Sequence, residues 1–187
     1  DAGRTRITLR NGGLMDTAQF ARLIGVTVEN QALALPGITN VDRASLFAGN
    51  GGKLSLPQVT QVAKSDGCYD MEWRAEGAGS LLDLSSVTNL YGGDCFHLNL
   101  RAVAGGQLLV SGLETISNGF VWVMADGAGS LVDLVKLASF SSADRVLDLE
   151  ARSGGQVRVP LMVDGGRTRI ALRHGGVMDT AQFTRLF

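Results

Sequence analysis

The sequence contains little proline, cysteine, aromatic residue and lysine, and no long apolar run. Its 187 residues include 3 prolines and 2 cysteines, aromatic residues make up 6%, and lysine occurs only at Lys53, Lys64 and Lys136. No apolar run is long enough to cross a bilayer, so we expect no membrane insertion. The formal net charge of −1 argues against a dedicated nucleic-acid-binding protein, and we expect no nucleic-acid partner.

Glycine, in contrast, is abundant at 25 of 187 residues, nearly twice its usual share. Five of its glycine pairs recur at bends along the chain: Gly12 and Gly13, Gly51 and Gly52, Gly105 and Gly106, Gly154 and Gly155, and Gly175 and Gly176. Two longer variants end in serine, at residues 77–80 and 127–130. No helix pattern follows any of them, so we interpret them as tight corners and not as phosphate-binding loops.

The two ends of the chain carry nearly the same sequence. Gly3 to Leu23 reads GRTRITLRNGGLMDTAQFARL and Gly166 to Leu186 reads GRTRIALRHGGVMDTAQFTRL, with 17 of 21 positions identical. A periodic structure returns to its opening sequence in this way, whereas a fold with one central core has no reason to do so. The sequence therefore predicts one domain over residues 1–187, made of a 163-residue super-repeat (about 3–165) and the first rung of the next copy (166–187).

A shorter period lies inside the long one. After most corners, apolar residues recur at offsets +2, +4, +7 and +10, as in Leu82, Leu84, Val87 and Leu90. Alternation with period two indicates strands with one buried face. Hairpins of an antiparallel sandwich would not hold the same offsets through successive segments, whereas stacked parallel coils do. We expect about eight rungs of roughly 23 residues, with three short strands per rung and right-handed connections.

The recurring phrase of a strand followed by Gly-Gly-x-Leu-x-Leu-x-x-Leu-x-x-Ile resembles the right-handed single-stranded parallel β-helix (β-solenoid) superfamily. It is most similar to the repeat regions of large bacterial surface and secreted proteins. The resemblance implies an all-β fold. Members of the superfamily include pectate lyases, polygalacturonases, tailspikes and adhesins, so the resemblance leaves the function open.

The positions of the carboxylates and histidines indicate whether the sequence fits the enzymatic members of that superfamily. Glycoside cleavage needs two positioned carboxyl groups. Asp83 and Asp133 share an outward ladder but are separated by the rung that carries Leu109, which places them about 10 Å apart. No aromatic sugar platform or third carboxylate is evident beside them, and a solvated sheet face is the expected role. His97 and His174 fall at different offsets without further ligands. We therefore expect no catalytic residue, no metal and no cofactor.

The two cysteines occupy equivalent positions on neighbouring rungs. Cys68 and Cys95 each lie three residues before the first inward residue of the following strand, namely Met71 and Leu98. Residues stacked on adjacent rungs lie within disulfide range. The sequence thus leaves two alternatives open, a disulfide and a pair of reduced, packed thiols.

Several large apolar residues are expected to point outward. They are Leu81, Leu109, Phe120, Trp122 and Leu131. Exposed apolar clusters often mark interfaces, so we predict a lateral interface, with a covering loop as the alternative. Arginines concentrate in the two terminal copies, where ladder salt bridges such as Arg169 with Asp148 are expected; binding of an acidic polysaccharide is the alternative.

These patterns favour a non-catalytic structural or adhesive module of an extracellular or cell-surface fibre. Further copies of the chain would be its partners, by covalent continuation or by self-assembly into a filament, and surface glycans are a second partner class. The expected end-to-end rungs contain Gly3, Arg6, Ile7, Phe20 and Leu23 at one end, and Gly166, Arg169, Ile170, Phe183 and Leu186 at the other. The alternative function is a polysaccharide-binding or polysaccharide-processing β-helix of the pectate-lyase type.

Overall fold

The computed structural model describes residues 5–62, 69–163 and 165–183, without the side chains of residues 93, 94 and 96. Within these ranges every regular element is a β-strand and every strand pair is parallel. No helix in the described part of the chain is long and apolar enough to cross a membrane.

The long sheet runs the length of the molecule. Its main path is β1 (Arg6–Arg10), β2 (Gly25–Glu29), β4 (Ser45–Gly49), β7 (Met71–Glu76), β9 (Asn89–Val103), β11 (Thr115–Asp126), β14 (Leu147–Arg152) and β16 (Thr168–Arg173). Two short strands join it beside this path, β6 (Gln61–Val62) against β9 and β13 (Ser139–Ser141) against β11. Neighbours in this sheet are one rung apart in sequence, as a coil requires.

The short sheet lies behind the long one. Its order is β3 (Ala32–Ala34), β5 (Lys53–Ser55), β8 (Leu81–Asp83), β10 (Gln107–Leu109), β12 (Leu131–Asp133), β15 (Gln156–Arg158) and β17 (Val177–Met178). Each of these strands follows a long-sheet strand after one corner.

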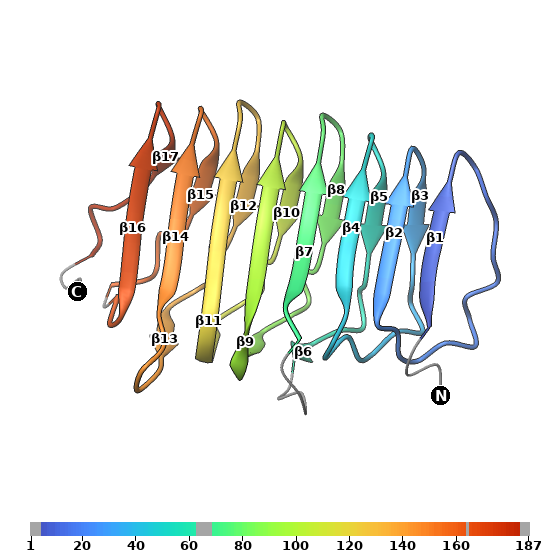
Figure 1. Ribbon diagram of the computed structural model, residues 1–187, viewed down its shortest axis with the longest axis horizontal. Coiled ribbons are helices and arrows are strands. Elements are labelled where there is room, and N and C mark those ends of the chain that lie inside the picture. Colours follow the sequence, from blue (N-terminus) through green and yellow to red (C-terminus); the bar gives the residue numbers. More distant parts are fainter. Residues whose placement is uncertain (1–4, 63–68, 164, 184–187) are drawn as a thin grey trace.

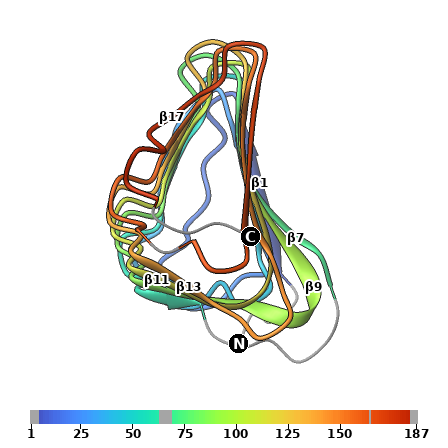
Figure 2. The same ribbon diagram turned by 90° about the vertical axis from the view of Figure 1, so that its left-hand side faces the viewer.

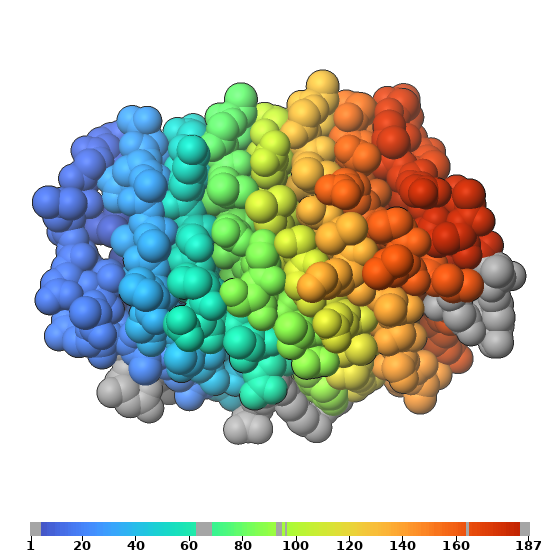
Figure 3. Space-filling view, turned by 180° about the vertical axis from the view of Figure 1, so that it is seen from behind, coloured from blue at the N-terminus to red at the C-terminus, as the bar shows by residue number. Residues whose placement is uncertain are grey.

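The path of the chain gives the coil its hand. In Figure 1 the long-sheet strands run upward on the near side, the chain turns over the top, and the short strands descend behind. Successive rungs advance from right to left, from β1 to β16. This is a right-handed coil. Viewed along its axis, the rungs superpose into one tapering outline (Figure 2), and from behind they form adjacent bands (Figure 3).

The right-handed parallel β-solenoid predicted from the sequence is confirmed, although it has about six turns instead of eight rungs. The terminal rungs account for the difference. The residues after β1 form no strand of the short sheet, which begins only at β3, and β17 is the last strand of the described chain.

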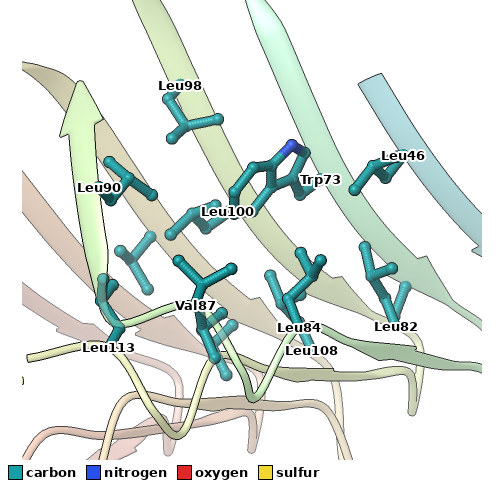
Figure 4. Packing of buried hydrophobic residues seen from close by; sticks show 14 of the residues in the cluster. Leu46, Trp73, Leu82, Leu84, Val87, Leu90, Leu98, Leu100, Leu108 and Leu113 are labelled. Carbon is teal, nitrogen blue, oxygen red and sulfur yellow. The ribbon is translucent and has the colours of Figure 1, made fainter. Parts of the chain in front are cut away.

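The core consists of inward ladders at the predicted offsets. Leu82, Leu84 and Val87 of one rung pack beside Leu108 and Leu113 of the next (Figure 4), all with 0% exposure. Ordinary burial of a leucine side chain stabilises a fold by about 1.5–3 kcal/mol, so these repeated ladders hold the coil together.

A single large side chain fills the centre of the coil. Trp73 is fully buried in this core, and its Nε1 donates a hydrogen bond to the Ala44 carbonyl oxygen of the preceding rung at 3.0 Å. Its polar group is therefore satisfied inside an apolar interior.

Four of the five glycine pairs named above lie at the corner between a long-sheet strand and the short-sheet strand that follows it, and the fifth, Gly12 and Gly13, follows β1. At the corner after β9, Gly105 has φ +88°, a left-handed conformation that suits glycine. A Cβ on Gly106 would lie 2.3 Å from the Ala75 carbonyl oxygen, so its backbone must pass directly against the preceding rung. These two constraints explain why the corners carry two glycines.

Candidate functional site

The outward side chains of β7, β9, β11, β14 and β16 form rows across the long sheet. Strand register places Glu72 beside Asn99, Asn99 beside Trp122, Trp122 beside Asp148, and Asp148 beside Arg169. The adjacent row contains Arg74, Arg101, Met124, Glu150 and Ala171. Residues far apart in sequence thus share one surface, which we call the outer face of the long sheet.

A hollow of about 420 Å³ lies at the C-terminal end of this face. Its lining includes Trp122, Asp148, Glu150, Arg169, Ala171 and Arg173. Ala171 stands in register with Glu150, and its methyl group leaves space between the longer flanking arginines. We call this space the C-terminal hollow.

Glu150 is the least exposed ionisable residue of the C-terminal hollow. It is 8% exposed, and its Oε1 accepts no hydrogen bond from any residue that the structure describes. Two guanidinium groups approach the same oxygen, Arg152 Nη1 at 3.6 Å and Arg173 Nε at 3.9 Å. Since a buried carboxyl oxygen without a hydrogen bond is costly, such a group is a candidate for a functional role.

Asp148 differs from Glu150 in its surroundings. Its two oxygens accept hydrogen bonds from Arg169 Nε at 2.5 Å and Nη2 at 2.6 Å, a bidentate pair. This pairing raises the pKa of Arg169, chiefly through the hydrogen bond and then through the charge of Asp148. The salt bridge expected from the sequence between these residues is therefore present, and it lies at the rim of the hollow.

A second arginine, Arg152, joins two carboxylates next to the C-terminal hollow. Its Nη2 lies 2.9 Å from Asp126 Oδ2, while its Nη1 approaches Glu150. The hydrogen bond from Arg152 lowers the pKa of Asp126, and burial opposes this effect only in part. Asp126 is thus held ionised beside the hollow.

Trp122 forms the apolar wall of the C-terminal hollow. It is half-buried, and the guanidinium carbon of Arg101 lies 5.7 Å from its ring centroid. Arg101 is itself held by Glu72, with Nη1 at 2.8 Å from Oε1. The indole is therefore fixed on one side and open to the hollow on the other.

A smaller hollow of about 150 Å³ lies toward the N-terminal end of the same face. Its lining includes Arg6, Gly25, Thr27, Phe47 and Glu72. It contains one carboxylate, so it lacks the paired acids of the C-terminal hollow.

Another outward cluster lies at the lower edge of the long sheet. The ring of His97 stacks on Phe120 with centroids 5.1 Å apart, and the guanidinium carbon of Arg145 lies 4.8 Å above Phe120. Asp70 Oδ1 accepts a hydrogen bond from the His97 backbone N–H at 2.8 Å, and this bond lowers the pKa of Asp70.

The residues predicted to form a lateral interface are divided among separate places. Phe120 and Trp122 point outward but lie beneath arginines. On the short sheet, Leu81 and Leu131 flank Gln107 in one row, whereas Leu109 lies between Asp83 and Asp133 in the next. All five are half-buried, and a lateral interface stays a prediction.

The aspartate ladder of the short sheet has the predicted register but not the predicted solvation. Asp133 is 8% exposed and lies 3.3 Å from Arg158 Nη1, so the expectation of a solvated face is wrong at this residue. Asp83 Oδ1 instead accepts the Ser85 backbone N–H at 3.0 Å and stabilises a turn.

The remaining predicted residues are placed as follows. Cys95 is disulfide-bonded, and Cys68 lies outside the described residues, so their pairing stays a prediction. Gly3 and Leu186 also lie outside the described residues. His97 and His174 lie apart, and the described residues contain no group of three metal-ligating side chains.

Sequence reasoning missed the C-terminal hollow because it searched the ladder of the short sheet. The missing aromatic platform and the further carboxylates lie on the other sheet, as Trp122, Asp148 and Glu150. Aligning the runs at 121–125, 147–151 and 168–172 by their inward residues would have brought these three into adjacent rows.

Comparison with known proteins gives one informative similarity. The chain is 30% identical over 133 residues to a polygalacturonase of Arabidopsis thaliana, QRT3, and the match covers 71% of this chain and 25% of the relative. The matched part thus spans about a quarter of the relative's length. No family model matches the chain, and no solved structure does.

This similarity corrects one expectation. The prediction that the chain is not an enzyme is wrong, because the chain is similar to a protein named for an enzymatic activity. The error arose from counting only the carboxylates of the short sheet, where no second acid lies on the adjacent rung. The β-helix fold itself agrees with both the sequence and the relative.

Proposed function

We propose that the chain is a polysaccharide-processing β-helix that binds an acidic polysaccharide of the polygalacturonate type along the outer face of the long sheet. The C-terminal hollow carries this proposal, since it combines an aromatic wall, two carboxyl groups and two arginines in a chain similar to a polygalacturonase. This is the second of the two functions that the sequence left open.

Binding follows from the chemistry of the lining. Arg169 and Arg173 present guanidinium groups, which match the planar carboxylate of a uronate sugar in a bidentate geometry. The indole of Trp122 offers a flat apolar surface on which the C–H face of a sugar ring can pack. Both arginines are more than half exposed in the unbound protein, so a ligand can reach them.

Cleavage is assigned to Asp148 and Glu150. They are two residues apart on β14 and point to the same face, which separates their Cα atoms by about 6.6 Å. Inverting glycosidases hold their two carboxyl groups about 6.5–9.5 Å apart, which leaves room for a water molecule, and side chains that extend from Cα atoms at this spacing can reach that separation. Glu150 in its protonated form gives its proton to the leaving glycosidic oxygen. Asp148 removes a proton from the water whose oxygen bonds to the anomeric carbon as the C–O bond breaks.

Substrate binding frees the base for this step. In the unbound protein Arg169 neutralises Asp148 through two hydrogen bonds. A uronate carboxylate that binds Arg169 competes with Asp148 for the same donors, and the released aspartate can then accept a proton. The site thus becomes basic only when an acidic sugar is present.

Such an activity belongs outside the cell, where acidic polysaccharides of this kind are found. A disulfide at Cys95 is consistent with an oxidising compartment. Extracellular location is therefore part of the proposal.

The test is release of reducing ends from polygalacturonate by the full chain and by Glu150→Gln. Loss of the general acid should lower kcat by about 100-fold or more, with little change in KM. Glu114→Gln is the matched control, because Glu114 is exposed and lies away from the hollow. An inactive wild-type chain that still binds polygalacturonate would reject cleavage and leave only a binding module. A Glu150→Gln variant as active as Glu114→Gln would reject the assignment of the acid.

A further inference from the structure

The two copies of the terminal sequence occur in opposite surroundings, which allows the structure to be compared with itself. The first copy has a rung on its C-terminal side, since β2 pairs with β1. The second copy has a rung on its N-terminal side, since β14 pairs with β16. Each copy therefore shows what the other lacks.

The first copy shows how this rung holds its successor. Arg10 Nε lies 2.6 Å from Glu29 Oε2. The side-chain amide of Gln31 spans the corner, where its Oε1 accepts the Gly12 N–H at 2.5 Å and its Nε2 donates to the Gly13 carbonyl oxygen at 3.2 Å. The successor rung thus supplies a carboxylate and an amide at fixed positions.

The second copy repeats these groups at the end of the described coil. Arg173, Gly175 and Gly176 are the counterparts of Arg10, Gly12 and Gly13. Leu9 is 6% exposed in the first copy, whereas its counterpart Leu172 is 47% exposed. The same leucine is therefore covered where a described rung follows it and exposed where none does.

The N-terminal end of the coil differs from the second copy in its short-sheet residues. In the second copy Val177 and Met178 form β17 by pairing with β15, and Met178 is 8% exposed. Their counterparts Leu14 and Met15 form no strand and are 97% and 48% exposed. Within the described residues, no strand pairs with Leu14 and Met15 as β15 pairs with Val177 and Met178.

We propose that the C-terminal end of the coil, formed by β16 and β17, is a docking surface for a parallel rung with the sequence of residues 24–34, as the next copy of the repeat would supply. Such a rung would place a glutamate against Arg173 and a glutamine across the Gly175–Gly176 corner. It would also cover Leu172 and pair the open edge of β16.

Direct stacking of one intact chain on another is disfavoured by charge. If β1 of one chain docked on β16 of another in register, Arg6 would face Arg169 and Arg10 would face Arg173. Like charges directly opposite each other in a sheet are destabilising. Continuation of the coil therefore needs the second rung of a repeat next to this surface, and not a second copy of the first rung.

The test replaces Phe187 with a copy of residues 24–62, so that Leu186 is followed as Leu23 is, and follows hydrogen–deuterium exchange by mass spectrometry. We expect amide exchange in residues 168–173 to slow by about tenfold or more, with protection of the appended strand. A matched chain carries the same appended residues in scrambled order and should leave exchange at 168–173 unchanged. A third chain carries Glu29→Arg in the appended copy only and should lose most of the added protection.

None of these measurements depends on enzymatic activity, so they test the docking surface separately from the proposed function. Equal exchange in the correct and scrambled extensions would overturn the docking surface. Sedimentation of the unextended chain should give a monomer at low and at high salt, and end-to-end oligomers of that chain would overturn the charge argument.

Discussion

Ser130 provides a sharp test of how successive rungs are joined. Its side chain is buried at 2% exposure in the corner after β11, where Oγ donates to the Asp126 carbonyl oxygen at 2.6 Å and accepts the Gly105 N–H at 2.9 Å. The first contact closes its own corner and the second reaches the preceding rung. Ser80 makes the same two contacts in the corner after β7, two rungs earlier. Its Oγ donates to the Glu76 carbonyl oxygen and accepts the Gly51 N–H.

Ser130→Ala removes both bonds without adding bulk. The Gly105 N–H loses its partner, whereas the Asp126 carbonyl oxygen keeps its hydrogen bond from the Ala104 N–H at 2.9 Å. An unsatisfied buried polar group costs about 1–3 kcal/mol, so we expect a loss of about 2 kcal/mol. For a chain of this size that corresponds to a decrease in Tm of about 4–8 °C.

Urea unfolding followed by circular dichroism measures this change, with Ser139→Ala on an exposed strand as control. The double variant Ser80→Ala with Ser130→Ala should lose about the sum of the two single effects, since the sites share no partner. A loss below about 0.5 kcal/mol for Ser130→Ala would refute the idea that the serine hydroxyl joins the rungs.

Two further perturbations test the corners and the ion pairs. Gly106→Ala should destabilise the coil by about 3 kcal/mol or more, because its Cβ would lie 2.3 Å from the Ala75 carbonyl oxygen. Gly12→Ala should cost only the strain of its positive φ, since its Cβ would have no atom of the described residues within 4 Å. Thermal unfolding distinguishes the two variants. The pKa of Asp126 is lowered by Arg152, so this pair stabilises the fold fully above the unfolded pKa of about 3.9 and loses its effect as pH falls through the lower, folded pKa. Asp126→Asn should therefore lower Tm most at pH 7 and progressively less as pH falls below about 3.9, and an equal decrease at every pH would contradict the ion-pair explanation.

The side chains that face the core of the coil could be predicted residue by residue. The offsets after each corner identified Leu82, Leu84 and Val87 as core, because strand alternation and rung stacking both require apolar residues at those positions. The glycine corners were equally predictable, since glycine favours the positive φ of Gly105 and has no Cβ to clash at the close approach of Gly106.

The outward half could not be predicted in the same way. Met124 points away from the core yet is 0% exposed, because its neighbours in register are Arg101 and Glu150, whose long side chains flank it. Contacts of this kind join residues a whole rung apart, and the rungs differ in length. Alternation indicates which side a residue faces, but it does not indicate how long its neighbours are or where they end.

The hollow illustrates the same limit. Glu150 is buried by the arginines around it, and Ala171 opens the space beside it only because the two residues are in register. Neither fact follows from the sequence around either residue alone. The apolar offsets of one ladder therefore do not reveal the hollow, which depends on residues of three neighbouring rungs.

Tryptophan fluorescence tests most directly whether the C-terminal hollow binds an acidic polysaccharide. Of the two tryptophans, Trp73 is fully buried and Trp122 lines the hollow, so a binding signal must come from Trp122. We predict that polygalacturonate changes the emission of the wild-type chain in a saturable, salt-sensitive manner, and that Arg169→Gln weakens binding about tenfold while Trp122→Phe abolishes the signal. An emission that stays unchanged up to saturating polygalacturonate, or a response that persists in Trp122→Phe, would contradict the account.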